Sequence, residues 1–312
     1  MTVLAIDIGG TKLAAGVVDA AGKILVRGEV PTVAAEGPER VLERIVGLGK
    51  DLLGKPEVSA LPIRRIGIGC AGPVDRLAGL VLNPPNLPGW TRIALVDHLQ
   101  QAVGLPAVLE NDANAAALGE FRYGAGKGAR SLVYVTVSTG IGGGIILDGK
   151  IWHGLKDAAG EIGHMTLAPD GPPCGCGNRG CLEAIASGPS IARRAREAVA
   201  GGRPTRLREI SHLTAGDVVS LAREGDEVAC EVWEETVRYL GLGVAAAITI
   251  LAPERVVIGG GVTGAGEFLF EPLRREVRSR VKLVPLESIP ILPAALGRDV
   301  GILGAAAIAL DA

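Results

Sequence analysis

The same local pattern occurs twice in this chain: an apolar strand, a glycine-rich turn and a second apolar strand, at residues 3–18 and again at 132–147. The turns read Gly-Gly-Thr at residues 9–11 and Ser-Thr-Gly at residues 138–140. Runs of Val, Ile, Leu and Ala on both sides of a short glycine turn are typical of β-hairpins. A hairpin repeated within 312 residues predicts two domains with similar cores, each presenting one glycine turn at a strand end.

The segments outside the hairpins alternate between helical and strand-like patterns. Apolar side chains recur with helical spacing at residues 38–53 and 226–251, whereas residues 65–70 and 255–258 are predicted to be buried strands. Aromatic residues make up only 3% of the chain, so the core is built from aliphatic side chains. Such a core suits parallel strands covered by helices, and the expected fold class is therefore α/β.

The end of the chain helps to place the domain boundary. Residues 301–311 form an apolar, Ala-rich segment that we expect to be a helix packed back onto the first domain. We therefore assign residues 1–113 plus 300–312 to a smaller N-terminal α/β domain. The remaining residues, 114–299, are assigned to a larger α/β domain.

Charge and hydropathy exclude several classes of protein. The net charge of −2 gives no reason to expect nucleic acid or an anionic membrane as a partner. Asp7 interrupts the first apolar run, which has no basic segment before it, so a signal peptide is not expected. The best candidate for a membrane span, residues 241–253, is too short. We expect a cytoplasmic protein, in which Arg193, Arg194 and Arg196 form a solvated helix face.

The first glycine turn belongs to the motif Asp7-Ile-Gly-Gly-Thr-Lys12, which joins two strands. It is therefore not a P-loop, which has wider glycine spacing. Backbone amides at Gly9 and Gly10 can approach phosphate oxygens, Thr11 adds a hydroxyl, Lys12 adds a charge, and Asp7 could hold Mg²⁺ through water. On its own, however, the motif is more typical of a plain hairpin turn.

Two further glycine loops follow apolar strands. One covers residues 138–144, and the other is the triplet Gly259, Gly260 and Gly261. Each alone has a simple explanation as a tight turn, since the chain contains 46 glycines. Three such loops, each directly after an apolar strand, together favour nucleotide binding.

A carboxylate, Asp112, lies where a predicted strand passes into a predicted helix. Read locally, Asp112 is more simply the N-cap of that helix. The functional alternative is a general base that takes the proton of a hydroxyl as it attacks a γ-phosphate. The neighbouring amides of Asn111 and Asn114 suit the recognition of sugar hydroxyls.

The most specific cluster combines one histidine with three cysteines, His164, Cys174, Cys176 and Cys181, within 18 residues. Crowded cysteines in a chain without an export signal indicate metal binding rather than disulfides. The set matches a tetrahedral Cys₃His zinc site in which the protein supplies all four ligands, so the zinc would be structural. Glycine spacers that let the loop wrap an ion disfavour the alternative of unrelated thiols.

Seven motifs along the whole chain resemble the ROK family, and within it the bacterial glucokinases. They are D-I-G-G-T-K at 7–12, L-N-P-P-N-L-P-G-W at 82–90, E-N-D-A-N-A-A-A at 110–117, S-T-G-I-G-G-G at 138–144, G-E-I-G-H at 160–164, C-x-C-G-x-x-G-C-x-E at 174–183, and the glycine triplet at 259–261. Any one of them is weak evidence, but all of them in this order are highly specific.

The resemblance implies an actin-like, two-domain ATPase fold with the active site in the interdomain cleft. It implies ATP-dependent phosphorylation of glucose at the 6-hydroxyl, with Asp112 as the catalytic base. The implied contacts to ATP phosphates are Gly9, Gly10, Thr11, Lys12, Thr139 and Gly140. The implied contacts to the sugar are Asn83, Asn111, Asp112, Glu161, His164 and Glu183. The implied zinc ligands are the same His164, Cys174, Cys176 and Cys181, so that one ring nitrogen of His164 faces the metal and the other faces the sugar.

Several alternatives stay open. The family also contains sugar-responsive repressors, but these carry a helix-turn-helix before the first strand, and only six residues precede Asp7 here. Among kinases, N-acetylmannosamine, N-acetylglucosamine, fructose and allose are possible substrates in place of glucose, because the implied contacts read hydroxyls that many hexoses share. The resemblance also suggests a homo-oligomer, either a dimer or a tetramer.

Overall fold

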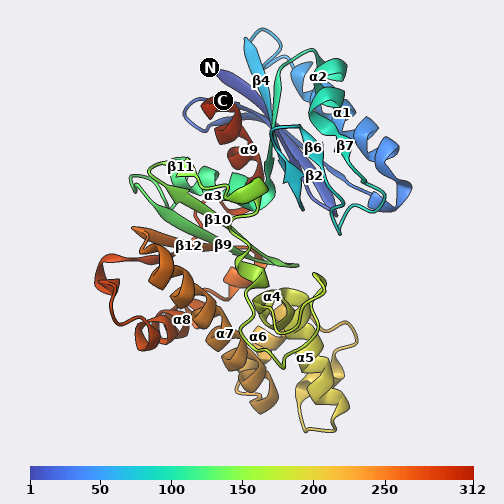
Figure 1. Cartoon of the computed structure of the whole chain (residues 1–312). Coiled ribbons are helices and arrows are strands. Elements are labelled where there is room, and N and C mark those ends of the chain that lie inside the picture. The colour runs from blue at the N-terminus through green and yellow to red at the C-terminus, as the bar shows by residue number, and fades with distance from the viewer. The chain divides into compact units, whose positions relative to one another are not determined.

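The computed structural model describes residues 1–312, which form two compact units (Figure 1). The first unit comprises Met1–Arg130, Gly144–Gly160 and Ala295–Ala312, and the second comprises Ser131–Gly143 and Glu161–Ala294. The expected boundary after residue 113 differs from this division, because residues 114–130 and 144–160 belong to the first unit.

Helix packing explains why the first unit extends past the expected boundary. Helix α3 (Asp112–Tyr123) begins at the end of a first-unit strand and packs along α9 (Val300–Asp311). The two helices approach closely at a pair of glycines, where a Cβ on Gly119 would lie 2.9 Å from the backbone nitrogen of Gly304. This contact is local in space but joins segments that are far apart in the sequence.

The first unit contains a five-stranded sheet with the order β3-β2-β1-β4-β8. Its strands are β1 (Thr2–Ile8), β2 (Lys12–Asp19), β3 (Ile24–Pro31), β4 (Ile63–Cys70) and β8 (Ala107–Asn111). The first three form an antiparallel meander, and β4 and β8 extend the sheet in parallel with β1. A small second sheet joins β5 (Val74–Asp75), β6 (Leu80–Val81) and β7 (Ile93–Ala94).

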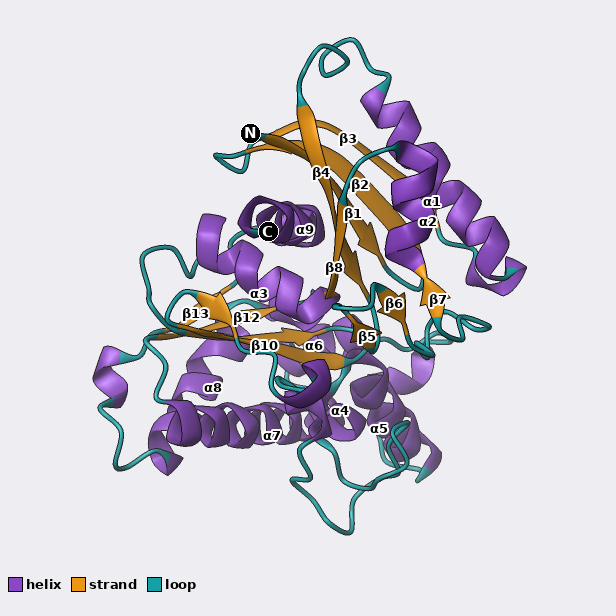
Figure 2. Ribbon diagram, turned by 45° about the horizontal axis from the view of Figure 1, so that its top comes forward, coloured by secondary structure: helices purple, strands orange, loops and turns teal.

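Both faces of the five-stranded sheet are covered by helices (Figure 2). Leu4, Ile6 and Ile8 of β1 join the core beneath α1 (Pro38–Leu53) and α2 (Leu95–Val103). Val3 and Ala5, which point the other way, pack against α9. Successive side chains of a strand point to opposite faces, so one continuous apolar run supplies both layers. The predicted return of the last helix to the first domain is confirmed.

Another five-stranded sheet, with strands from both residue sets, has the corresponding strand order. The order is β11-β10-β9-β12-β13, with β9 (Leu132–Val137), β10 (Ile141–Leu147), β11 (Lys150–Ile151), β12 (Arg255–Gly259) and β13 (Ile291–Pro293). The chain passes from the second unit to the first within β10, between Gly143 and Gly144. As in the first unit, two parallel strands, here β12 and β13, continue the sheet beside the hairpin.

Apart from its strands, the second unit consists mainly of helices and loops, and it includes the helix predicted at residues 226–251. Its helices are α4 (Leu182–Ala186), α5 (Gly188–Ala200), α6 (Ala215–Arg223), α7 (Glu227–Leu251) and α8 (Glu267–Arg280). Val133, Val135 and Val137 of β9 join their core. No helix in the chain combines the length and the hydrophobicity that crossing a bilayer would need.

Candidate functional site

The glycine turn of the first unit is held in place by three hydrogen bonds. Gly9 N–H donates to the carbonyl of Lys12 at 3.0 Å, and Thr32 N–H donates to the carbonyl of Thr11 at 2.9 Å. The buried Thr32 hydroxyl donates to the carbonyl of Gly9 at 2.6 Å. A Cβ at Gly10 would lie 2.6 Å from the Cβ of Asn86, so only glycine fits there. The turn is therefore a rigid backbone surface, of the kind that can bring amides close to phosphate oxygens.

Asp7 lies beside this turn, near the end of β1. Its carboxylate packs against Gly301 at the start of α9, where any added Cβ would overlap it. Burial raises the pKa of Asp7 to about 6, and the charge of Lys12 opposes that rise only in part. A carboxylate in such a place is stabilised by a nearby cation, which fits the predicted role in holding Mg²⁺ through water.

The glycine turn of the second unit is held by a carboxylate. Ser138 N–H donates to the carbonyl of Gly140 at 2.8 Å, and Gly188 N–H donates to the carbonyl of Ser138 at 2.8 Å. Glu183, from the first turn of α4, accepts the N–H of Ile141 at 2.8 Å. The same Glu183 carboxylate closes over Gly140, where a Cβ would lie 2.5 Å from its oxygen. Glu183 therefore shapes the turn that carries Thr139.

A cavity of about 710 Å³ opens next to this second turn. Its size lies within the range of small-molecule sites. Its walls include Ser138 and Thr139 from the turn, Thr214 and Gly216 from the start of α6, Arg196 and Arg223 from helices, and Gly261. The predicted solvated face at Arg193, Arg194 and Arg196 is wrong in part, because the Arg194 side chain is only 12% exposed beside Glu235. Arg196 is exposed as predicted and also lines this cavity. The sequence spacing alone did not distinguish the largely buried Arg194 from the exposed Arg196.

The three glycines at residues 259–261 have different surroundings. Gly261 lines the cavity. A Cβ at Gly259 would lie 2.5 Å from the Tyr134 hydroxyl, and one at Gly260 would overlap the backbone of Val137. Close packing against β9 therefore explains Gly259 and Gly260, whether or not a nucleotide binds.

Asp112 is the first residue of α3, and the N-cap of that helix is Asn111. The Asn111 side-chain oxygen accepts the N–H groups of Ala113 at 2.9 Å and Asn114 at 3.2 Å, and its amide donates to the carbonyl of Gly72 at 3.1 Å. The interpretation of Asp112 as an N-cap is therefore wrong. Asp112 is a partly exposed carboxylate at the end of a parallel strand, and hydrogen bonds hold the side chain of the preceding Asn111. A carboxylate in such a position can serve as a base.

The two other amides of the predicted sugar site are in different surroundings. Asn114 is 2% exposed and donates to Glu110 at 3.1 Å, so it has no surface for a sugar. Asn83 is exposed on the loop that surrounds the buried Trp90, and its N–H donates to the Trp90 carbonyl at 3.0 Å. Asn83 also adopts a left-handed conformation, with φ of 46°, which Asn tolerates better than most residues.

The predicted metal ligands come together. The ligand atoms of His164, Cys174, Cys176 and Cys181 all lie within 4.8 Å of one another. The Sγ atoms of Cys176 and Cys181 are 3.7 Å apart, and Cys174 Sγ is 3.7 Å from His164 Nδ1. Ligand edges of roughly 3.5–3.8 Å are expected around tetrahedral zinc with Zn–S near 2.3 Å. The four residues therefore fit a four-coordinate zinc ion.

The acid–base chemistry of the thiols also fits a metal. Burial, with smaller contributions from Cys174 and Cys176, raises the pKa of the Cys181 thiol to about 12. Burial also raises the pKa of the Cys174 thiol, and a bound dication would stabilise the thiolate forms of these cysteines. A Gly180 with φ of 66°, packed against the Ala168 carbonyl, lets the loop turn back on itself here.

His164 has its two ring nitrogens facing different groups. Nδ1 faces the cysteines, and Nε2 lies 3.8 Å from a carboxylate oxygen of Glu161. Glu161 is well exposed, and Glu183 begins the helix that follows Cys181 directly. In the second unit, then, the structure brings together the metal ligands, the two predicted sugar carboxylates and the turn that carries Thr139.

Comparisons with known proteins agree along the whole chain. The sequence profile of the ROK family matches residues 3–312. A glucokinase of Thermotoga maritima is 37% identical over 99% of this chain and 97% of its own, and an N-acetylmannosamine kinase of Citrobacter koseri is 37% identical over 99% of both. The crystal structure of a ROK family glucokinase from Streptomyces griseus in complex with glucose and AMPPNP superposes with a TM-score of 0.84, at 36% identity over 100% of both chains.

These matches cover both glycine turns, the Asp112 segment and the metal cluster within one continuous alignment range. Sugar kinase activity and the α/β, actin-like ATPase fold are supported by relatives that this chain matches from end to end. The chain belongs to the ROK family.

Proposed function

We propose that this protein is an ATP-dependent hexokinase that phosphorylates glucose at the 6-hydroxyl, with Asp112 as the general base. The observation that carries this proposal is the placement of Asp112. It stands at the end of β8, is partly exposed, and follows an N-cap residue that is bonded on both sides. A base must be positioned closely relative to the hydroxyl that it deprotonates, and the hydrogen bonds of Asn111 restrain the backbone beside Asp112.

In the proposed reaction, the Asp112 carboxylate accepts the proton of the sugar hydroxyl. The hydroxyl oxygen forms a bond to the γ-phosphorus of ATP, the bond from that phosphorus to the bridging oxygen breaks, and ADP leaves. Mg²⁺, when bound, neutralises charge on the phosphates, and Asp7 is the residue proposed to hold it through water. Asp7 suits this role because its buried carboxylate lacks a full charge partner.

ATP contacts are proposed from both glycine turns. In the first unit they are Gly9, Gly10, Thr11 and Lys12, and in the second they are Thr139 and Gly140. The cavity beside Thr139 and Gly261 is proposed to take the nucleoside, since its volume and its mixed apolar and hydroxyl walls suit a base and a ribose. Gly259 and Gly260 support this cavity by packing rather than by contact.

Sugar contacts are proposed at Asn83, Asn111, Glu161, His164 and Glu183. The Asn111 side-chain amide donates to the Gly72 carbonyl, and its oxygen accepts two N–H groups of α3. A hydrogen bond from Asn111 to the sugar would therefore have to share an atom that is already bonded. Zinc is proposed to be structural, because four protein ligands fill a tetrahedral shell and leave no position for a reacting group. Its task would be to orient His164 and the loop around it.

The test of the proposed base is Asp112→Asn, which keeps the size of the side chain but removes its basicity. We expect kcat to fall by about 10²- to 10⁴-fold while the affinity for sugar changes little. Asp97→Asn, an exposed carboxylate on α2, is the matched control and should keep wild-type kinetics. An Asp112→Asn enzyme with more than about a tenth of wild-type kcat would remove Asp112 from this role.

The choice of glucose rests on relatives rather than on a contact to C2. N-acetylmannosamine kinases match this chain at the same identity as glucokinases, so an acetamido sugar is the second candidate. The discriminating measurement is kcat/KM at fixed ATP for glucose, mannose, fructose, allose, N-acetylglucosamine and N-acetylmannosamine, coupled to ADP release. A higher kcat/KM with an acetamido sugar than with glucose would support the proposed kinase activity but show that glucose is not the preferred substrate.

A further inference from the structure

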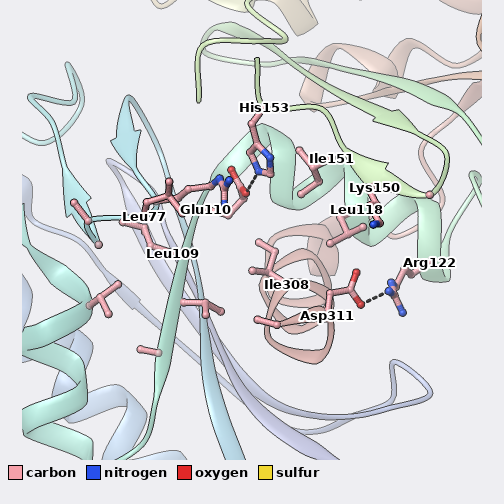
Figure 3. A pocket seen from close by; sticks show the side chains of 18 of the residues that line it. Leu77, Leu109, Glu110, Leu118, Arg122, Lys150, Ile151, His153, Ile308 and Asp311 are labelled. Carbon is pink, nitrogen blue, oxygen red and sulfur yellow. Dashed lines mark hydrogen bonds and ion pairs between the residues drawn. The ribbon is translucent and has the colours of Figure 1, made fainter. Parts of the chain in front are cut away.

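A second large cavity, of about 920 Å³, lies in the first unit behind β8 and α3 (Figure 3). Leu109, Leu118 and Ile308 line one part of it. At another part, the side chains of Glu110 and His153 point toward each other from two different segments (Figure 3). Glu110 is the residue two before Asp112, so this cavity gives access to the rear of the proposed catalytic segment.

Glu110 is a buried carboxylate with three hydrogen-bond donors around it. Its side chain is 4% exposed. One oxygen faces His153 Nε2 at 2.7 Å, and the other accepts the N–H of Asn111 at 3.0 Å and the amide of Asn114 at 3.1 Å. Burying a carboxylate is costly unless such donors compensate it. The three hydrogen bonds are therefore what allows this side chain to be buried here.

The Glu110 bonds reach the residues on both sides of Asp112. Asn111, which donates its N–H to Glu110, is the N-cap of α3, and Asn114, which donates its amide, lies in the first turn of that helix. Glu110 therefore ties the end of β8 to the start of α3 across Asp112. His153 is the donor that holds the opposite oxygen of Glu110, and so fixes the orientation of the carboxylate plane.

His153 itself is anchored by its backbone and open to the cavity. Its carbonyl accepts the N–H of Ala159 at 2.9 Å, while 22% of its side chain is exposed. Its position just after β11 places it 43 residues from Glu110 in the sequence. The backbone hydrogen bond fixes the position of His153, and its Nε2 contacts Glu110, so the ring can hold the carboxylate in one orientation.

We propose that Glu110 and His153 are positioning residues that hold Asn111 and Asp112 in the geometry that phosphoryl transfer needs. This inference rests on the proposed role of Asp112 as the base. Removing the His153 ring takes away the shortest bond to Glu110, which is then free to rotate away from the Asn111 amide. A shift of about 1 Å at a reacting group costs on the order of 10²-fold in rate.

The experiment is His153→Ala, assayed with and without added imidazole. The variant leaves a ring-sized space that opens on the 920 Å³ cavity, so imidazole from solution can reach Glu110. We expect kcat to fall by roughly 10- to 100-fold, the KM for ATP to stay within about twofold, and imidazole to restore at least several-fold of the lost kcat. His153→Phe fills the same space without a donor and should be slow and insensitive to imidazole.

Two controls separate positioning from general damage. His98→Ala makes the same change at an exposed position of α2 and should keep wild-type kcat with or without imidazole. Thermal unfolding of each variant confirms that the assays are run on folded protein, because a loss of stability alone would not give a kcat loss in fully folded enzyme. Wild-type protein with imidazole shows any effect of the reagent itself.

The possible outcomes decide the proposal. Wild-type kcat in folded His153→Ala overturns it, as does a slow variant that imidazole leaves unchanged, or a His153→Phe enzyme that imidazole accelerates. Asp112→Asn, measured beside them, tests the proposed function separately. If Asp112→Asn is slow and the His153 variants are not, the base stands and the positioning pair falls; if Asp112→Asn is active, the base falls, and the positioning proposal falls with it.

Discussion

The hairpins β1–β2 and β9–β10 occupy the same place in two sheets of the same strand order, yet their turns are supported by different chemistry. The second-to-last residue of the first strand is Asp7 in one hairpin and Thr136 in the other, and each pairs with a glycine, Gly69 or Gly259, of the neighbouring parallel strand. The backbone arrangement is thus repeated, while the side chain beside the turn changes from an acid to a neutral hydroxyl.

The bracing groups differ as well. In the first unit, the neutral Thr32 hydroxyl holds the turn, and Asp7 packs against Gly301. In the second unit, the Glu183 carboxylate holds the turn and belongs to the helix that follows the predicted metal ligand Cys181. The shared strand order therefore fixes where each turn lies. Which side chain supports the turn depends on the neighbouring element that packs against it.

The largest expected difference between the two hairpins follows from removing the proposed zinc. Cys176→Ala leaves three ligands, and structural zinc supplies much of the folding energy of short, glycine-rich loops. We expect about one zinc per chain in the wild type and almost none in the variant, with sugar affinity reduced at least tenfold because His164 and Glu161 lose their support. Affinity for an ATP analogue should fall less, through the single Glu183 bond to Ile141.

Metal analysis and separate titrations of sugar and ATP analogue measure these effects. Cys230→Ala, a cysteine of α7 outside the cluster, is the matched control and should keep its zinc. Normal sugar binding by metal-free Cys176→Ala would disprove the link between metal and sugar. An unchanged ATP affinity would show that Glu183 keeps its place without the ion.

The next prediction concerns the acid of the first hairpin. Because burial raises the pKa of Asp7 from 3.8 to about 6, the folded protein binds this proton more tightly than the unfolded chain. Stability is therefore lost as pH rises from about 4 to above 6, by up to roughly 3 kcal/mol, an upper bound because the side chain keeps some exposure. Asp7→Asn has no titrating group at this position. As pH rises, the unfolding free energy of the wild type should therefore fall relative to that of Asp7→Asn by the same amount.

Denaturant unfolding at pH 4 and pH 7, without added Mg²⁺ or nucleotide, measures this shift. The comparison between hairpins supplies the control: Thr136→Val changes the equivalent position, which carries no titrating group, so its effect on stability should be the same at both pH values. A wild-type minus Asp7→Asn difference that does not change with pH would contradict the buried-acid explanation.

A smaller effect is expected at the carboxylate that holds the second turn. Glu183→Ala leaves the Ile141 N–H without its acceptor and should lower the free energy of unfolding by about 1–3 kcal/mol. Glu183→Gln keeps a carbonyl oxygen for the same N–H and should cost less than about 1 kcal/mol. Equal losses in the two variants would mean that charge, rather than the hydrogen bond, supports this turn. Denaturant unfolding at neutral pH makes the measurement.

The smallest effect is expected at the matching brace of the first turn. Thr32→Val preserves the shape of a fully buried side chain but removes the hydroxyl that donates to the Gly9 carbonyl, at a cost of about 1 kcal/mol. Thr249→Val, an exposed threonine that bonds to the Ala245 carbonyl within α7, should change stability much less. A Thr32→Val protein as stable as the wild type would show that the two backbone bonds hold this turn without help.

Much of this protein is determined locally, and those parts follow from the sequence by itself. The helix predicted at residues 38–53 has these bounds in the structure, because its apolar spacing and Pro38 at its start leave few alternatives. The capping box that Thr214 and Asp217 form at the start of α6 is equally local, because the two residues are three positions apart. The four predicted metal ligands lie within 18 residues, so chain connectivity alone keeps them near one another.

Other features depend on contacts between distant segments, and only the tertiary structure decided them. Glu110 meets His153 across 43 residues, and Asp7 meets Gly301 across 294, with nothing in either local pattern to indicate the partner. The first unit extends past residue 113 because α3 packs on α9. Local propensity acts over a few residues, whereas burial of a polar group depends on which elements pack around it, and that packing is set by the fold as a whole.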